Sequence, residues 1–355
     1  MKKINRVLFI FIFFLFHISF LLIFLVSPKE NFSEYENRYF EKLHFRTFST
    51  YVSDHFPFRN SLLSIHNHFQ ALLGKKNLNG IYLGKDDYLI PEFKPNNATD
   101  YTVRIIDDFQ KKNGNVDLML VPDSILINES KLGFSPLENE SKYIHEIYSK
   151  LNTNSIDLTS DFMELNTYEP LYYKTDHHWN SIGAYYAYID YQMSRGKDYY
   201  PFEKFALEKV SDDFLGTSSS KLIGFGKKED IYRVGWNPEV SVEFVLEKRI
   251  EDQIYYSEHL KTKDKYSYFL DGNHALIVID NKERNDGSSI VIIKNSYANC
   301  FIPYLIPHYD KIHVIDLRYY NDNVTNYITD HQIQDKLILY NLNNYYSDLS
   351  IIKLK

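Results

Sequence analysis

Near the middle of the chain the sequence reads Lys174-Thr175-Asp176-His177-His178-Trp179-Asn180, which places a carboxylic acid, two imidazoles and an indole at four consecutive positions. A carboxylate beside a histidine can hold one imidazole tautomer and stabilise the ring once it is charged, as hydrolases and acyltransferases require. In an extended segment Asp176 and His178 point to the same side, whereas His177 points to the other. We therefore predict that Asp176 and His178 cooperate.

The nucleophile for this pair is expected far downstream, where an apolar strand ends in Ile290-Val291-Ile292-Ile293-Lys294-Asn295-Ser296-Tyr297. The pattern turns from strand to helix at Ser296, which places this serine at the C-terminal edge of a parallel sheet, where ligands bind in open α/β folds. Backbone N–H groups at the start of a helix can also hold an oxyanion. The alternative is that Ser296 only caps the helix.

Metal binding is a second interpretation of the acid and its neighbouring histidines. Asp176, His177 and His178 are metal-ligand types, but adjacent histidines in a strand diverge and no further ligand cluster is evident. A single cysteine, Cys300, excludes an intramolecular disulfide and a cysteine-based zinc site. We therefore predict neither a metal nor another cofactor. In a purely structural interpretation, Asp176 caps the following helix and Trp179 packs in the core.

Strands and helices alternate from about residue 98, which predicts an α/β fold with helices on both faces of a mostly parallel sheet. The expected helices are 60–73, 100–112, 141–151, a helix opening at Asn180 or Ser181, and 326–335. The expected strands are 80–83, 88–90, 116–121, 156–158, 240–246, 275–279, 289–293, 311–317 and 337–340. Strands 80–83 and 88–90 form one predicted hairpin, and 275–279 and 289–293 form another, around Asn285-Asp286-Gly287.

Three regions are expected. Residues 1–27 form a cytoplasmic stub and membrane anchor, residues 28–97 an arm with a helix and a hairpin, and residues 98–355 the α/β domain. Within that domain, residues 200–270 break the alternation and are interpreted as an insertion of loops and short strands. Such loops commonly shape a substrate cleft; the alternative is a solvated excursion.

The N-terminus predicts a membrane anchor. Lys2, Lys3 and Arg6 precede an apolar run from Val7 to Val26, which is long enough to span the roughly 30 Å hydrocarbon core of a bilayer. Positive charges before the run keep that end in the cytoplasm. The bulky residues that end the run favour an uncleaved single-pass anchor over a cleaved signal peptide. The rest of the chain is then extracytoplasmic.

Composition narrows the class of partner. The formal net charge is −7 and no long basic block is present, so nucleic acid is not expected as a partner. Aromatic residues make up 16% of the chain. This abundance fits stacking on sugar rings, or a compositional bias of the genome.

The acid–histidine segment, Asp176-His177-His178-Trp179, is followed by Asn180 and Gly183-Ala184. This pattern resembles the DHHW family of bacterial extracytoplasmic proteins. That family is similar to the SGNH-like proteins of alginate and other exopolysaccharide O-acetylation. Nearly the whole exported chain shares the resemblance, through Glu36-Asn37-Arg38, Asp54 to Arg59, Asn79 to Gly84, Val121-Pro122, Asp213 to Gly216, Lys294 to Ala298 and Asp316 to Arg318.

The resemblance implies an SGNH-like three-layer α/β/α fold and an O-acyltransferase or esterase acting on a cell-surface polysaccharide. Ser296 would be the nucleophile, His178 the base and Asp176 the residue that orients it, in the permuted order of the acetylation relatives. A multi-pass membrane acyltransferase is the implied partner. Lys294-Asn295-Ser296 departs from the Gly-Asp-Ser pattern of SGNH enzymes.

Four further residues are expected around the substrate: His177, Trp179, Tyr297 and Arg318. Arg318 is expected to contact an anionic or polar group, and its alternative is a surface salt bridge. The altered serine block and the aromatic content leave a second functional class open, a catalytically silent glycan-binding or scaffold subunit. A metal-dependent hydrolase is the third.

Overall fold

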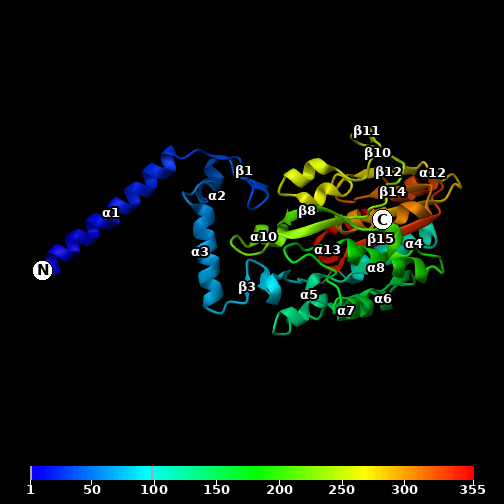
Figure 1. The fold of residues 1–355 in the computed structure, drawn as a ribbon, viewed down its shortest axis with the longest axis horizontal. Coiled ribbons are helices and arrows are strands. Elements are labelled where there is room, and N and C mark those ends of the chain that lie inside the picture. The colour runs from blue at the N-terminus through cyan, green and yellow to red at the C-terminus, as the bar shows by residue number, and fades with distance from the viewer. Residues whose placement is uncertain (1, 97–98) are drawn as a thin grey trace.

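An eight-stranded sheet forms the centre of the computed structural model, which describes residues 2–96 and 99–355 (Figure 1). Its order is β11-β10-β12-β14-β13-β15-β6-β7. The bounds are β6 Asp117–Val121, β7 Asn154–Ile156, β10 Val240–Phe244, β11 Arg249–Glu251, β12 Leu276–Asn281, β13 Ser289–Lys294, β14 Lys311–Ile315 and β15 Asp335–Asn341. The strands from β14 to β7 run parallel, and β12, β10 and β11 add an antiparallel edge. The prediction of a mostly parallel sheet is confirmed.

Helices cover both faces of this sheet because its central strands are apolar on both sides. Successive side chains of a strand point to opposite faces. Ile290 and Ile292 of β13 accordingly pack in one core, while Val291 and Ile293 pack in the other. The first core includes side chains of α7 (Thr159–Leu165), α8 (Ser181–Ser194) and α11 (Ile302–Leu305). The second includes α4 (Thr99–Asn113), α6 (Glu140–Ser149), α12 (Val324–Asp330) and α13 (Leu342–Ser347).

The predicted hairpin between β12 and β13 is wrong. β14 lies between the two strands, antiparallel to β12 and parallel to β13. All six residues of β13 are buried, which suits a central strand with a neighbour on each side. The connection 282–288 carries the turn residues that suggested the hairpin, but it is long enough to pass over the end of β14. Its Ser288 carbonyl accepts the backbone N–H groups of Asp310 and Lys311.

The region 200–270 is more integrated than the predicted insertion. β8 (Glu208–Phe214) and β9 (Glu229–Arg233) form an antiparallel ribbon, with the short helix α10 (Thr217–Lys221) between them. β10 and β11, however, extend the central sheet. The predicted insertion therefore contains two strands of the main fold, which alternation along the chain does not indicate.

The predicted hairpin of the arm is present and touches the acid–histidine segment. β4 (Ile81–Leu83) pairs with β5 (Leu89–Pro91) on one side and β3 (Asn77–Leu78) on the other. The Leu89 N–H donates to the Lys174 carbonyl at 2.8 Å. Before this hairpin, β1 (Phe32–Ser33) pairs with β2 (Arg38–Tyr39), and α2 (Phe48–Asp54) precedes α3 (Arg59–Leu72).

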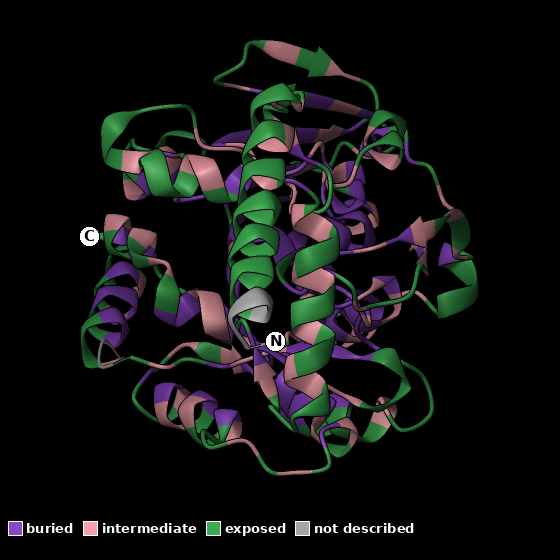
Figure 2. Cartoon of the chain, turned by 90° about the vertical axis from the view of Figure 1, so that its left-hand side faces the viewer, coloured by how far each residue is buried: buried purple, intermediate pink, exposed green. Residues whose placement is uncertain are grey.

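The N-terminal helix α1 (Lys2–Val26) projects away from the α/β body (Figure 1). Its segment Arg6–Val26 has a mean hydropathy of 2.9 and is long and apolar enough to cross a membrane. Figure 2 views the molecule from the side on which α1 projects, and shows most of this helix exposed from Arg6 onward, with intermediate burial near its C-terminal end.

Gly183 lets α8 approach the acid–histidine segment. A Cβ at this position would lie 2.5 Å from the Leu171 carbonyl oxygen and 3.1 Å from Trp179 Cβ. We expect Gly183→Ala to lower the free energy of unfolding by about 1–3 kcal/mol through overpacking, although alanine favours helix by about 1 kcal/mol. Chemical denaturation of the full chain measures the change. Met193→Ala on the same helix, where the side chain is exposed, is the control and should have little effect.

Candidate functional site

Two segments that are 118 residues apart meet at the C-terminal edge of β13. The Ser296 hydroxyl lies 2.7 Å from His178 Nε2, and His178 Nδ1 lies 2.5 Å from Asp176 Oδ1. Ser296 is 9% exposed, and the other two side chains are more deeply buried. Serine, imidazole and carboxylate therefore form one continuous hydrogen-bonded chain, shielded from bulk water.

Asn295 fixes the position of Ser296 at the end of β13. Its side-chain oxygen accepts the Tyr297 N–H and so caps a short 3-10 helix, Ser296–Cys300. Its amide nitrogen donates to Asn341, whose own amide donates to Asp123. The predicted helical turn is thus present, but Asn295 rather than Ser296 caps it, and the Tyr297 N–H is occupied by that cap.

Asp176 is held by hydrogen-bond donors on both carboxylate oxygens. Oδ1 accepts the backbone N–H of His178 at 2.9 Å in addition to the imidazole. Oδ2 accepts the backbone N–H and the hydroxyl of Thr217, at 2.7 and 2.9 Å. Burial alone would raise the pKa of the Asp176 carboxyl, but the two adjacent imidazoles and these hydrogen bonds hold the pKa well below its ordinary value. Asp176 therefore carries a negative charge at neutral pH.

The His178 ring is fixed in its plane by an aromatic residue from the 200–270 region. Tyr266, in the 3-10 helix Lys265–Tyr268, stacks on the imidazole with centroids 3.7 Å apart and an interplanar angle of 8°. The tyrosine hydroxyl lies within hydrogen-bonding distance of the Ser296 carbonyl and of Cys300 Sγ. One side chain thus contacts both the imidazole and the turn that carries the serine.

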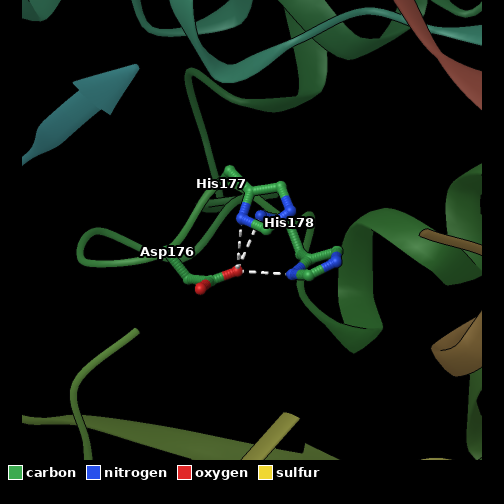
Figure 3. Close-up of side chains that lie close together, drawn as sticks. All are labelled: Asp176, His177 and His178. Carbon is green, nitrogen blue, oxygen red and sulfur yellow. Dashed lines mark hydrogen bonds and ion pairs between the residues drawn. The ribbon is translucent and has the colours of Figure 1, made fainter. Parts of the chain in front are cut away.

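His177 does not point away from Asp176, contrary to the geometry expected of an extended segment. Both imidazoles lie beside the same carboxylate oxygen (Figure 3), because residues 174–178 form a bend rather than a strand. His177 Nδ1 lies 2.6 Å from the Thr217 hydroxyl. Since that hydroxyl donates to Asp176, the His177 N–H donates to it. Burial and the neighbouring His178 lower the pKa of His177 to about 3, so its ring is neutral at neutral pH.

Trp179 and Tyr297 connect the segment that carries Asp176 and His178 to the turn that carries Ser296. The Trp179 indole N–H donates to the Tyr297 carbonyl at 2.8 Å, and the Tyr297 hydroxyl donates to the His177 carbonyl. Both side chains are fully buried, so neither presents a surface to a ligand.

A buried cation lies beneath the serine turn. Lys294 Nζ donates to the side-chain oxygens of Asn273 and Asn299, at 2.7 and 2.8 Å, and lies 3.7 Å from Asp316. Burial lowers the pKa of Lys294 to about 8. Arg318, which is partly exposed, forms a two-point contact with the same Asp316 carboxylate.

Metal binding would have to compete with this hydrogen bonding. The ligand atoms of Asp176, His177 and His178 lie within 4.8 Å of one another. However, the two Asp176 oxygens together accept four hydrogen bonds, and a cation would displace those donors. The donor set fits an orienting carboxylate better than a metal ligand.

A cavity of about 230 Å³ opens beside the hydrogen-bonded chain. Its lining includes His177, Thr217, Lys221, Asp123 and Asn343. Asp123 and Glu140 form a buried carboxyl pair, and their burial raises the pKa of both. Most of the side chains that line this cavity are polar, and Ser296, His178 and Asp176 are not among them.

Gly216, Thr217 and Tyr266 are the contacts that sequence reasoning did not single out. All three come from the 200–270 region, and only Gly216 lies in a segment of the family resemblance, Asp213 to Gly216. A Cβ on Gly216 would lie 2.4 Å from Asp176 Oδ2. The absence of a side chain there is what lets the carboxylate reach Thr217.

Comparison with known families then identifies the fold and the family. The sequence profile of the DHHW protein family matches residues 82–315, well over half of the chain. The chain belongs to the DHHW family. A DHHW family protein from Eubacterium siraeum has a similar structure, with 20% identity, a TM-score of 0.66, and coverage of 78% of this chain and 95% of that one.

Bacillus cereus PatB1 is also similar in structure to the present chain, with 20% identity, a TM-score of 0.64, and coverage of 78% of this chain and 99% of PatB1. A second PatB1 structure, with a sulfonyl adduct, gives 21% identity and a TM-score of 0.63, covering 78% and 98%. No curated protein matches the sequence significantly. These similarities establish an SGNH-like α/β fold, and the N-terminal apolar helix is a feature of this chain's own structure.

We expect Gly216→Ala to displace the Asp176 carboxylate. The reaction of Ser296 with an aryl sulfonyl fluoride should slow by about a hundredfold, because a shift of about 1 Å in a catalytic group has that cost. Intact-mass measurement follows the adduct. Ser218→Ala is the matched control, because the buried Ser218 hydroxyl has no hydrogen-bond partner among the described residues. Equal rates in the two variants would contradict the prediction.

Asp176→Asn should reveal the depressed pKa of Asp176 through the pH dependence of stability. A carboxyl whose folded-state pKa is lowered stabilises the fold above its unfolded pKa of about 4, and loses that contribution as the pH falls further. The stability deficit of the variant should therefore be largest at neutral pH and shrink below about pH 4.

Asp190 provides a control of opposite sign. Burial raises its pKa to about 7, so the stability of the folded state falls as the pH rises from about 4 to about 7. Asp190→Asn should remove that fall and gain stability relative to the natural protein over this range. Thermal unfolding across the pH series measures both variants, and parallel pH profiles would refute the assignment.

Proposed function

We propose that this protein is an SGNH-like O-acyltransferase or esterase that uses Ser296 as nucleophile, His178 as base and Asp176 as the orienting carboxylate. The continuous hydrogen-bonded chain from Ser296 to Asp176 is the observation that carries the proposal. A paired serine and imidazole, with the imidazole oriented by a third group, is the arrangement that nucleophilic catalysis needs.

Because the ionised Asp176 can only accept, His178 donates its Nδ1–H to it, which leaves Nε2 to accept the Ser296 proton. Ser296 Oγ attacks an acyl carbonyl while its proton passes to His178 Nε2, and the Asp176 charge stabilises the imidazolium. The leaving alcohol takes that proton, and an acyl-serine remains. A sugar hydroxyl or water then gives its proton to His178 and takes the acyl group, while His178 returns a proton to the leaving Ser296 Oγ and so regenerates the serine.

Two partly accessible groups, His177 and Arg318, are the proposed substrate contacts, and of these His177 lines the cavity. The neutral His177 ring faces the cavity, and Arg318 offers a partly exposed guanidinium for a polar or anionic group. Trp179 and Tyr297 are proposed to support the site from the core rather than touch the substrate, because both are fully buried.

The proposed substrate is a cell-surface polysaccharide, most simply as the acceptor of an acetyl group. The family, the fold shared with PatB1 and the presence of a sulfonyl adduct on a structure of that protein support serine-based acyl chemistry. We propose that α1 anchors the protein, with the α/β domain outside the cytoplasm, and that a multi-pass membrane acyltransferase supplies the acyl group.

A catalytically silent glycan-binding or scaffold subunit is the alternative. It is favoured by the enclosure of the site, since Ser296 is only 9% exposed and Tyr266 covers one face of His178. Glycan binding that survives loss of Ser296 and His178, without turnover of any ester, would support this alternative.

The decisive variant is Ser296→Ala. We expect hydrolysis of a chromogenic acetyl ester to fall by at least about a thousandfold, because loss of a nucleophile removes the acyl-enzyme route. The acetyl content of the surface glycan in cells carrying the variant should fall as well. Ser218→Ala should leave both unchanged, and Ser296→Ala with full activity in both assays would refute the proposal.

A further inference from the structure

Helix α3 has one face that packs on the body and another that does not. On the packed face, the Asn67 side chain donates to the Ile223 carbonyl at 2.9 Å, and His68 stacks on Phe225 with centroids 4.3 Å apart. Ser64 lies against Gly224 on the same face. These contacts fix the rotation of α3 about its axis.

The opposite face is an exposed apolar stripe. It consists of Leu62, Ile65, Phe69 and Leu72, spaced by three or four residues so that they share one side of the helix. They are 42%, 65%, 56% and 85% exposed. An exposed apolar stripe of this length marks an interaction surface.

Helix α3 lies at the end of the molecule from which α1 projects. Figure 1 shows α1 and α3 at the same end of the molecule, and Figure 2, viewed from that end, shows both helices in front of the α/β body. A bilayer crossed by α1 therefore faces the exposed side of α3.

Contacts between α1 and the arm determine how deep the arm lies along the apolar segment of α1. Phe20 stacks on Phe56 with centroids 5.7 Å apart, and Phe24 meets Tyr51 of α2 edge to face. Phe20 lies six residues before Val26, about 9 Å by helical rise. The start of α3 is thereby tied to the C-terminal end of the apolar span, where Tyr51 is the kind of amphipathic aromatic residue that gathers at membrane interfaces.

Phe58 gives an independent indication of a contact partner. It precedes α3 with a φ of 60°, in the left-handed region that bulky residues avoid, and its ring is 64% exposed. Phe45 and Phe48 in the adjoining segment are also exposed. The strained backbone at Phe58 points its ring outward, so packing within the chain does not offset the strain.

We propose that the stripe on α3, together with Phe58, lies in the interfacial region of the bilayer and holds the α/β domain against the membrane surface. This inference rests on the proposed anchoring role of α1. Amphipathic helices bind in this way, with the apolar face inserted to about the headgroup–acyl boundary. A lipid surface fits better than a protein groove, because α1 itself fixes the arm at the interface.

The test places a fluorescent label on the stripe of the full chain. The natural Cys300 is buried, so an environment-sensitive maleimide should label only a cysteine introduced by Ile65→Cys or Leu72→Cys. Ile250→Cys on the edge strand β11, which is 68% exposed, is the matched control. Each protein is reconstituted into phosphatidylcholine–phosphatidylglycerol vesicles that contain a lipid with a nitroxide quencher near the headgroup.

We expect the quencher to remove about half of the emission at positions 65 and 72, as for a helix at the headgroup boundary, and little at position 250. Vesicle flotation reports the anchor separately. Variants that float without quenching on α3 would overturn the proposal while α1 anchoring stands. Variants that do not float would overturn both. A stripe that is unquenched in lipid vesicles but shielded from aqueous thiol reagents in native membranes would assign it to a protein partner instead.

Ester hydrolysis by the same labelled proteins keeps the two proposals distinct. Quenching without any turnover that depends on Ser296 would remove the proposed enzyme activity and leave the membrane contact of α3 in place.

Discussion

Two hydrogen bonds that cross between remote segments hold the candidate site together. The Trp179 indole donates to the Tyr297 carbonyl, and the Tyr297 hydroxyl donates to the His177 carbonyl. Each bond joins a fully buried aromatic side chain to the backbone, where an unpaired group would cost about 1–3 kcal/mol. Neither segment can shift without breaking a bond to the other. The short distance between His178 and Ser296 is therefore a property of this double connection rather than of the two side chains alone.

The region between the two segments completes the site. A buried carboxylate needs donors, and Thr217 supplies two of the four that Asp176 accepts. Thr217 is itself placed by the bend at residues 174–176, because the Gly216 N–H donates to the Thr175 hydroxyl and Glu229 accepts the Lys174 and Thr175 N–H groups. The acid is thus oriented by Thr217 of α10, the short helix between the two strands of the β8–β9 ribbon.

Local sequence patterns predicted the positions of helices and strands better than they predicted which strands pair with each other. The apolar runs at 116–121 and 289–293 are central strands, and the helix after Asn180 begins where its side chain accepts the Ile182 and Gly183 N–H groups. The pairing of β12 was mispredicted, because a turn signal gives no information on a third strand that arrives later in the chain. The direction of His177 was also mispredicted, since the bend depends on Glu229, 52 residues beyond it. The meeting of Asp176, His178 and Ser296 was suggested by the acid–histidine pair, by the position of Ser296 at the end of an apolar strand and by the order of motifs in a known family, whereas spacing alone does not indicate it.

Because the hydrogen-bonded chain from Ser296 to Asp176 is enclosed, the cavities around it determine how a substrate could reach it. Lys221 lines both the cavity beside His177 and a larger one, of about 440 Å³, against the inner side of α3. His66, Asn67 and Gln70 of that helix form part of the larger cavity's wall. One helix therefore carries an outward apolar stripe and an inward polar wall, and that wall's cavity shares Lys221 with the cavity beside His177. If the stripe rests on lipid, the inner wall is held about one helix diameter, roughly 10 Å, from the membrane surface.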